Sequence, residues 1–254
     1  MKQPLVVFGI ATFKGEPCLE FFNSYQDTLI HLAQSGIPSG RSMVPGDPYL
    51  SKARNRLAYE FLVNWPGATH LFFLDDDIGW QPEKVTEFVR RDLDIIVGAY
   101  PKKNDRGEFP VELDARDGAL VERDGLFRVT LMPTGFCCIK REVLERLAAV
   151  SGQYRDTTDP RTEMWQWNLF ENGWFLPDGT RPKQQGGVRG EFWGEDYYFG
   201  RRWRDMGGEI WLDPDIEFTH RGSKVWSGCI RASIEATKAK LAADAAAEQK
   251  EAAD

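Results

Sequence analysis

The stretch Thr69-His70-Leu71-Phe72-Phe73-Leu74-Asp75-Asp76-Asp77-Ile78-Gly79-Trp80 places four apolar residues directly before three carboxylates. An apolar run of this length between polar residues is typical of a strand that is buried on both faces of a sheet. The acids then follow the carboxyl end of that strand, which is the edge where open α/β sheets bind their ligands. The sequence therefore predicts a ligand site at this edge.

Three adjacent carboxylates repel one another, and a bound cation would relieve that repulsion. Hard divalent cations such as Mg²⁺ and Mn²⁺ prefer carboxylate oxygens as ligands. The alternative is a polar turn in which Asp76 or Asp77 caps the helix that is expected to start near Pro82. These residues alone are consistent with both interpretations.

Apolar periodicity around this stretch alternates between strand and helix spacing. That alternation predicts an α/β protein with a mostly parallel central sheet and helices on both faces. The expected segments are strands at 5–11, 40–46 and 93–99 and helices at 17–35, 49–65 and 82–91.

Beyond residue 100 the pattern is less regular. Glycine and proline between short alternating runs at 104–130 predict hairpins, which would form a small antiparallel extension of the sheet. The segment 151–190 is rich in Gly, Pro, Asp and Thr but contains several large aromatic residues, so we interpret it as a part-ordered lid. The remaining expected elements are a bend followed by a buried strand within 131–139, strands at 209–212 and 216–218, helices at 140–149 and 192–206, and an Ala-rich C-terminal helix at 230–254.

Composition narrows the classes of function. A net charge of −7 argues against a protein that binds nucleic acid through a broad basic surface. Four cysteines without a C-x-x-C pair are interpreted as reduced, largely buried thiols, which fits the cytoplasm. We expect no membrane span, because no stretch of about 20 apolar residues is present. We also expect a single domain at 1–229 followed by a helical tail at 230–254.

Two further segments carry candidate catalytic residues. Glu195 and Asp196 follow Gly194 at the start of a predicted helix, where a purely structural capping role is the alternative. His220 follows a strand, and Lys224 lies four residues later, within reach of a diphosphate bound to the same metal. A lone histidine is more often structural than a metal ligand.

Taken in order, Asp75-Asp76-Asp77, Gly194-Glu195-Asp196 and His220-x-Gly222-x-Lys224 resemble the GT-A glycosyltransferases, which use nucleotide sugars and carry a metal-binding D-x-D motif. Ala53-Arg54-Asn55 and Trp211-Leu212-Asp213-Pro214-Asp215 resemble the small soluble members of that superfamily, and the resemblance covers roughly residues 4–226. It implies a single GT-A domain that transfers a sugar from a nucleoside diphosphate sugar to an acceptor hydroxyl.

The resemblance also implies a role for each matching residue. Asp77 would bind Mn²⁺ or Mg²⁺ directly, Asp75 would assist, and His220 would complete the coordination. Asp76 would hydrogen-bond the ribose, and Thr12 would border the nucleoside. The expected donor is a UDP sugar, and the acceptor is a glycan, a protein or a modified nucleobase.

On the acceptor side, the resemblance implies that Asp196 is the general base, with Glu195 sharing that role or orienting the acceptor. Lys224 and Arg54 would add positive charge at the diphosphate. Trp193 would stack on a sugar, although packing is the alternative for any single ring. The Glu195-Asp196 pair resembles the inverting families, whereas His220-x-Gly222-x-Lys224 resembles retaining ones, so the stereochemistry stays open.

Two other functions compete with this one. Phosphatases of the haloacid dehalogenase type also place D-x-D after a buried strand, where the first Asp is the nucleophile. They normally carry the motif near the start of the chain, with Thr or Val where this chain has Gly79. The second competitor is a catalytically silent module that binds a sugar nucleotide or glycan.

Overall fold

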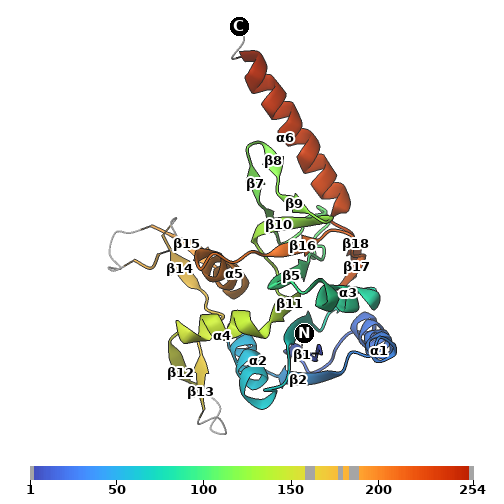
Figure 1. Cartoon of the computed structure of the whole chain (residues 1–254), viewed down its shortest axis with the longest axis vertical. Helices are drawn as coiled ribbons and strands as arrows, with labels where there is room; N and C mark the ends of the chain where they lie inside the picture. Colours follow the sequence, from blue (N-terminus) through green and yellow to red (C-terminus); the bar gives the residue numbers. More distant parts are fainter. Residues whose placement is uncertain (1–2, 158–163, 177–179, 183–188, 252–254) are drawn as a thin grey trace.

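The computed structural model describes residues 3–157, 164–176, 180–182 and 189–251. Its main element is a large mixed sheet with helices on both faces (Figure 1). The strand order is β2 (Ser39–Pro45), β1 (Val6–Thr12), β3 (His70–Asp75), β11 (Phe136–Lys140), β5 (Ile95–Gly98), β16 (Trp211–Asp213), β10 (Leu126–Leu131) and β6 (Glu112–Leu113), and β9 (Glu122–Arg123) also pairs with β10.

Parallel pairing dominates the half of the sheet that contains the acidic stretch. β1 pairs in parallel with both β2 and β3, and β16 pairs in parallel with β5. β11 lies antiparallel between β3 and β5, and β10 begins an antiparallel extension. The predicted fold class, a mostly parallel α/β sheet with an antiparallel extension, is therefore confirmed.

Burial on both faces explains the continuous apolar runs of β1 and β3. Val7, Leu71 and Phe73 pack in one core, whereas Phe8 and Phe72 pack in the other. Each fully buried side chain of this kind contributes roughly 1.5–3 kcal/mol to folding. The first core includes residues of α2 (Leu50–Asn64), α4 (Arg141–Ala149) and α5 (Glu195–Asp205), and the second includes residues of α1 (Leu19–Gln34) and α3 (Glu83–Arg91).

A second, small sheet consists of β4 (Ile78–Gly79), β17 (Phe218–Arg221) and β18 (Val225–Gly228). β4 directly follows the three acids, and its pairing with β17 sets His220 opposite Ile78. This pairing brings the C-terminal part of the chain back to the acidic strand end.

The predicted irregular segment contains two short hairpins in its described part. They are β12 (Gln153–Arg155) with β13 (Trp165–Trp167) and β14 (Gly173–Phe175) with β15 (Glu191–Trp193). The expectation of helix from residue 192 is wrong at its start, because 191–193 pair with β14 and α5 begins only at Glu195. Residues 158–163, 177–179 and 183–188, which belong to the predicted lid, lie outside the described residues.

Two peripheral elements complete the chain. The hairpin of β7 (Ala115–Arg116) and β8 (Ala119–Leu120) lies beside α6 (Arg231–Glu251), which projects from the body of the protein in Figure 1. Ile230 and Ile234 anchor the start of this helix in the core. Among the described residues, no helix combines the length and apolar character that crossing a membrane requires.

Candidate active site

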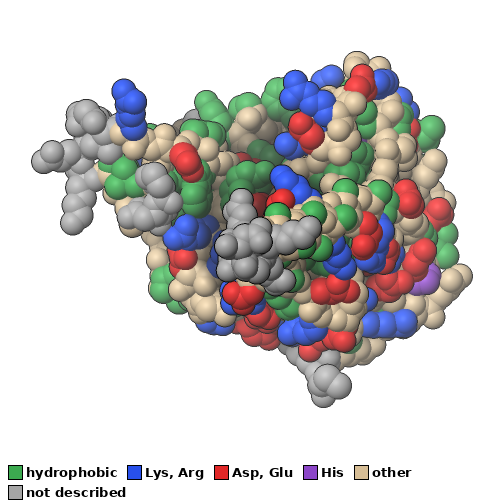
Figure 2. All heavy atoms as spheres, turned by 90° about the horizontal axis from the view of Figure 1, so that it is seen from above, with side chains coloured by type: hydrophobic (Ala, Val, Ile, Leu, Met, Phe, Trp, Pro, Cys, Tyr) green, Lys and Arg blue, Asp and Glu red, His purple; other side chains and the backbone are tan. Residues whose placement is uncertain are grey.

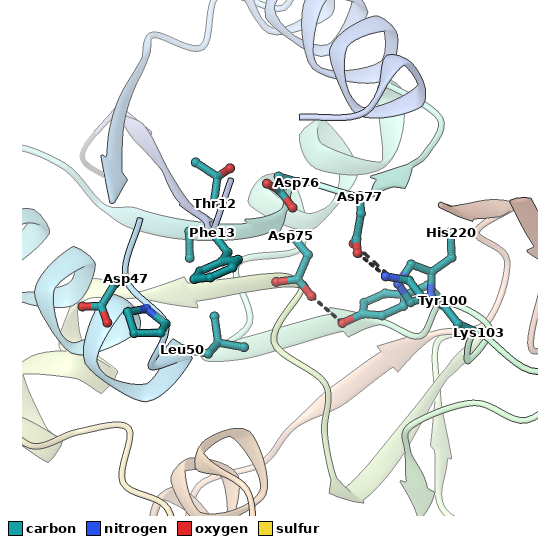
Figure 3. A pocket seen from close by; sticks show the side chains of 12 residues that line it. Thr12, Phe13, Asp47, Leu50, Asp75, Asp76, Asp77, Tyr100, Lys103 and His220 are labelled. Atoms are coloured by element: carbon teal, nitrogen blue, oxygen red, sulfur yellow. Dashed lines mark hydrogen bonds and ion pairs between the residues drawn. The ribbon is translucent and has the colours of Figure 1, made fainter. Parts of the chain in front are cut away.

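A cavity of about 370 Å³ opens at the carboxyl ends of β1 and β3. It is lined by Ala11, Thr12, Phe13, Asp47, Pro48, Leu50, Asp75, Asp76, Asp77, Tyr100, Lys103 and His220 (Figure 3). The surface turned toward the viewer in Figure 2 mixes acidic and basic side chains. Because it lies at the carboxyl ends of these two strands, the cavity is where the sequence predicts a ligand site.

Asp77 and His220 converge at one end of the cavity. Nε2 of His220 lies 3.5 Å from Oδ1 of Asp77. The other ring nitrogen, Nδ1, is 2.7 Å from the carbonyl oxygen of Pro101. A carbonyl can only accept, so Nδ1 carries the proton and Nε2 is the nitrogen that faces Asp77. A hydrogen bond of this kind to backbone is what orients a metal-binding histidine.

Lys103 forms an ion pair with the same carboxylate (Figure 3). Burial raises the pKa of Asp77, but the contacts with His220 and Lys103 outweigh this effect, so the pKa lies below its ordinary value. Asp77 is therefore held as an anion at neutral pH.

Asp75 is turned away from Asp77 and toward the interior. Its Oδ2 accepts from the hydroxyl of Tyr100 at 2.7 Å, and its Oδ1 lies 3.3 Å from the guanidinium of Arg54 (Figure 3). Gly135 makes this packing possible, because a Cβ there would come within 2.1 Å of Asp75 and 2.3 Å of Tyr100. The predicted part of Asp75 in metal binding stays a prediction.

Asp76 points to the opposite side, toward β1. The buried hydroxyl of Thr12 hydrogen bonds to its carboxylate and also accepts from the amide of Gly15. Burial raises the pKa of Asp76, and the neighbouring Asp75 and Asp77 add to that rise. Thr12 and Asp76 thus form a polar pair on one wall of the cavity.

Arg54 connects the cavity to the start of α5. Its guanidinium, in a residue only 3% exposed, pairs with Asp75 and with Glu195. Asp196 lies in the same electrostatic environment, and burial raises its pKa to about 6, which Arg54 limits and Glu195 increases. Arg54 bridges the acidic strand end and the Glu195-Asp196 pair, and its predicted role at the diphosphate stays a prediction.

Lys224 and Trp193 lie outside the residues that line the cavity. Lys224 pairs with Asp105 and lies over the ring of Trp226. Trp193 is on β15, and its indole N–H donates to Glu191. Their predicted contacts with the diphosphate and with a sugar stay predictions.

Sequence reasoning missed several residues that line the cavity. Phe13 and Asp47 lie in the loops that follow β1 and β2, and Tyr100 and Lys103 follow β5. The signal that could have found all four is their common position just after the carboxyl end of a predicted parallel strand.

The donor set at Asp77 suits a hard divalent ion. No group of three or more His, Cys, Asp or Glu side chains in the described residues is arranged to hold a metal by itself. Mg²⁺, however, is commonly bound by one or two protein ligands, with water and substrate phosphates as the others. Asp77 and His220 are the residues that would hold such an ion.

Comparison with known proteins finds no matching family model and no matching curated protein. Similar solved structures include A197 from STIV, with 16% identity, a TM-score of 0.49 and 86% of each chain covered. Another is GalNAc-T7 with UDP, GalNAc and Mn²⁺, with 11% identity, a TM-score of 0.47 and coverage of 85% of this chain and 43% of that chain.

A third similar structure is a UDP-glucose pyrophosphorylase complexed with UDP-glucose, with 8% identity, a TM-score of 0.40 and coverage of 93% of this chain and 98% of that chain. The similar structures thus include glycosyltransferases and nucleotide-sugar pyrophosphorylases. They are too distant to assign an activity, so the function has to be argued from the residues of the site.

Proposed function

We propose that this chain is a glycosyltransferase of the GT-A type, which transfers a sugar from a nucleoside diphosphate sugar to an acceptor hydroxyl. The observation that carries this proposal is the convergence of Asp77 and His220 in one cavity, with the second acidic pair joined to that cavity through Arg54. Three segments that are far apart in the sequence supply these groups, and each has a separate chemical task.

Asp77 and His220 would hold a divalent cation, Mn²⁺ or Mg²⁺, at the diphosphate end of the cavity. When bound, such an ion neutralises charge that develops on the departing diphosphate. Lys103 supplies a further positive charge at the same end, from the cavity wall. A compact ammonium on a flexible stem is well suited to a phosphate oxygen.

The opposite end of the cavity fits a nucleoside. Thr12 and Asp76 offer a hydroxyl and a carboxylate to the ribose hydroxyls. Phe13, which is 66% exposed, offers a flat apolar face on which a base can stack. Asp47 can accept from the ring N–H of uracil or guanine, whereas cytosine and adenine lack that donor. A UDP or GDP sugar therefore suits this end better than a CDP or ADP sugar, and the resemblance to the GT-A enzymes favours UDP.

Asp196 would be the general base that takes the proton from the acceptor hydroxyl. A pKa of about 6 leaves this carboxylate ionised at neutral pH and basic enough to accept that proton. Glu195 is held by Arg54, so it would orient the acceptor rather than move a proton. These roles imply direct displacement at the anomeric carbon and hence inversion.

Donor binding and transfer are tested together. A thermal-shift screen with UDP, GDP, CDP and ADP sugars, each with and without Mn²⁺, should give the largest rise in melting temperature with a UDP sugar plus Mn²⁺. NMR of the transfer product should then show an inverted anomeric configuration. If no nucleotide sugar raises the melting temperature, the chain is not a nucleotide-sugar enzyme. Retention of configuration would contradict the role of Asp196 alone.

The competing functions predict different products. A phosphatase would release phosphate from an aryl phosphate, and that activity should survive Asp196→Asn. Both carboxylate oxygens of Asp75, the nucleophile in that mechanism, are already engaged by Tyr100 and Arg54, which disfavours it. A silent module would bind the donor with Mn²⁺ but release neither free sugar nor transfer product over hours.

A further inference from the structure

Lys103 is held at the cavity by a loop that docks on the β17–β18 hairpin. Asp105 in that loop pairs with Lys224 and accepts from the indole N–H of Trp226 at 2.9 Å. The loop is closed on itself, because the amide of Lys102 donates to the carbonyl of Glu108 at 2.8 Å. His220 belongs to the same hairpin. The hairpin therefore positions both the imidazole of His220 and, through the docked loop, the ammonium of Lys103 at Asp77.

The stem of Lys103 passes close to Gly222 on its way to Asp77. A Cβ at Gly222 would lie 3.1 Å from Cδ of Lys103 and 2.8 Å from the ring of Trp226. The absence of a side chain at position 222 thus leaves room for this lysine.

The ammonium of Lys103 contacts Oδ2 of Asp77, and His220 faces Oδ1, so a divalent ion bound to this carboxylate would lie next to the ammonium. Asp77 carries one charge and is also approached by His220, so an ammonium and a divalent ion on the same carboxylate would repel each other. A diphosphate changes this balance, because its oxygens offer the flexible lysine another anionic partner within the same cavity. Lys103 can then leave Asp77 without losing an ionic partner.

We propose that Lys103 couples the binding of the metal to the binding of the diphosphate. Without nucleotide, Lys103 competes with the divalent cation for Asp77; with nucleotide, it moves to the diphosphate and the cation binds more tightly. Because such coupling is reciprocal, the metal strengthens nucleotide binding by the same factor. This inference rests on the proposed function, since it assumes that a metal and a nucleoside diphosphate share the cavity.

Mn²⁺ binding measured by electron paramagnetic resonance tests the coupling without any turnover. Lys103→Met keeps the stem and removes the charge, so it should tighten Mn²⁺ binding about fivefold without nucleotide, which corresponds to about 1 kcal/mol. UDP should tighten Mn²⁺ binding markedly in the natural protein and much less in Lys103→Met. Lys103→Arg, which keeps the charge, should retain most of the coupling.

Lys102→Met is the matched control, because Lys102 is adjacent in sequence but pairs with Glu108 outside the cavity lining. It should leave both Mn²⁺ affinities unchanged. If Lys103→Met leaves them unchanged as well, while the natural protein binds Mn²⁺ and UDP, the coupling role is wrong and the proposed function stands. If the natural protein binds neither Mn²⁺ nor UDP, both proposals are overturned.

Discussion

The acidic strand end and the segment 151–193 are built in contrasting ways. Asp75 ends a strand that is buried on both faces and paired along its length with β1 and β11. The hairpins β12–β13 and β14–β15 have only three residues in each strand. An isolated two-stranded hairpin is at best marginally stable, so this segment depends on side chains from the rest of the protein.

Contacts from α2 and α5 fix that segment to the body of the protein. Asn55 of α2 is buried, and its side-chain oxygen accepts from the amides of Leu169 and Phe170 at 2.8 and 2.7 Å. The ring of Phe170 stacks on Phe199 of α5, with centroids 4.3 Å apart. Under the proposed function, the strand end would bind the donor and the hairpins would face the acceptor. Asp196 lies at the junction of the two.

The largest effect is expected at the strand end itself. Asp77→Ala removes the carboxylate that pairs with Lys103 and faces His220, so binding of Mn²⁺ and of the nucleotide sugar should weaken at least about 100-fold. Transfer, measured as kcat/KM, should fall by about 10⁴ or more. Asp27→Ala, at an exposed position of α1, is the control. Normal donor binding by Asp77→Ala would refute the assignment of the cavity.

Asp196→Asn should separate the two regions functionally. It leaves the donor cavity intact, so donor binding by calorimetry should be unchanged, whereas transfer should fall about 10²–10⁴-fold, as expected for loss of a general base. Asp205→Asn, at the end of the same helix, should have no such effect. Transfer at the normal rate by Asp196→Asn would show that another group is the base.

The same variant should be more stable than the natural protein at high pH. The pKa of Asp196 is raised on folding, so the folded state loses stability as pH rises from about 4 through about 6. Asparagine removes that penalty, which is on the order of 1–3 kcal/mol. The melting temperature of Asp196→Asn should exceed that of the natural protein by several degrees at pH 8 and match it near pH 4. Loss of transfer in a stabilised protein cannot be blamed on unfolding.

Asn55→Ala should loosen the hairpin segment while sparing the donor site. Its buried hydrogen-bond partners would be left unsatisfied, which should lower the free energy of unfolding by roughly 2–4 kcal/mol. Hydrogen exchange should accelerate most at 164–176, while UDP binding changes little. Asn64→Ala, at an exposed position of the same helix, is the control. Equal acceleration over β1 and β3 would contradict the view that the two regions are fixed separately.

The pH dependence of transfer should report the protonation state of Asp196. Because the base must be deprotonated, kcat/KM should rise about tenfold per pH unit below about 6 and level off above it. Donor binding measured over the same range is the reference that removes any titration of the donor cavity. A profile without this acidic limb would mean that Asp196 does not titrate during transfer.

The smallest effect is expected in the hairpin β14–β15, which belongs to the segment 151–193. Phe192 on β15 is 74% exposed, so Phe192→Ala should change stability by less than about 0.5 kcal/mol. If the ring contacts the acceptor, the KM for that acceptor should rise about threefold to tenfold, in line with the loss of one aromatic contact. Phe22→Ala, an exposed ring on α1, should leave that KM unchanged.

The sequence by itself determined the helices of the first hundred residues, their strands apart from β4, and the position of the acidic site. Local spacing is enough for this, because a strand buried on both faces must be continuously apolar and a carboxylate run can only follow it at its end. The buried thiols of Cys137 and Cys138 followed from the same reasoning. The ordered set of acids and His220 also indicated that distant segments meet.

Only the tertiary structure decided which side chains meet at the site. The insertion of β11 between β3 and β5 places Gly135 beside Asp75, and the short β4–β17 pairing places His220 beside Asp77. Neither pairing has a local signal, because each depends on segments far apart in the chain. For the same reason the sequence could not show that Lys103 rather than Lys224 reaches Asp77. A lysine's partner is set by the loop that carries it, and that loop is positioned by contacts with distant strands.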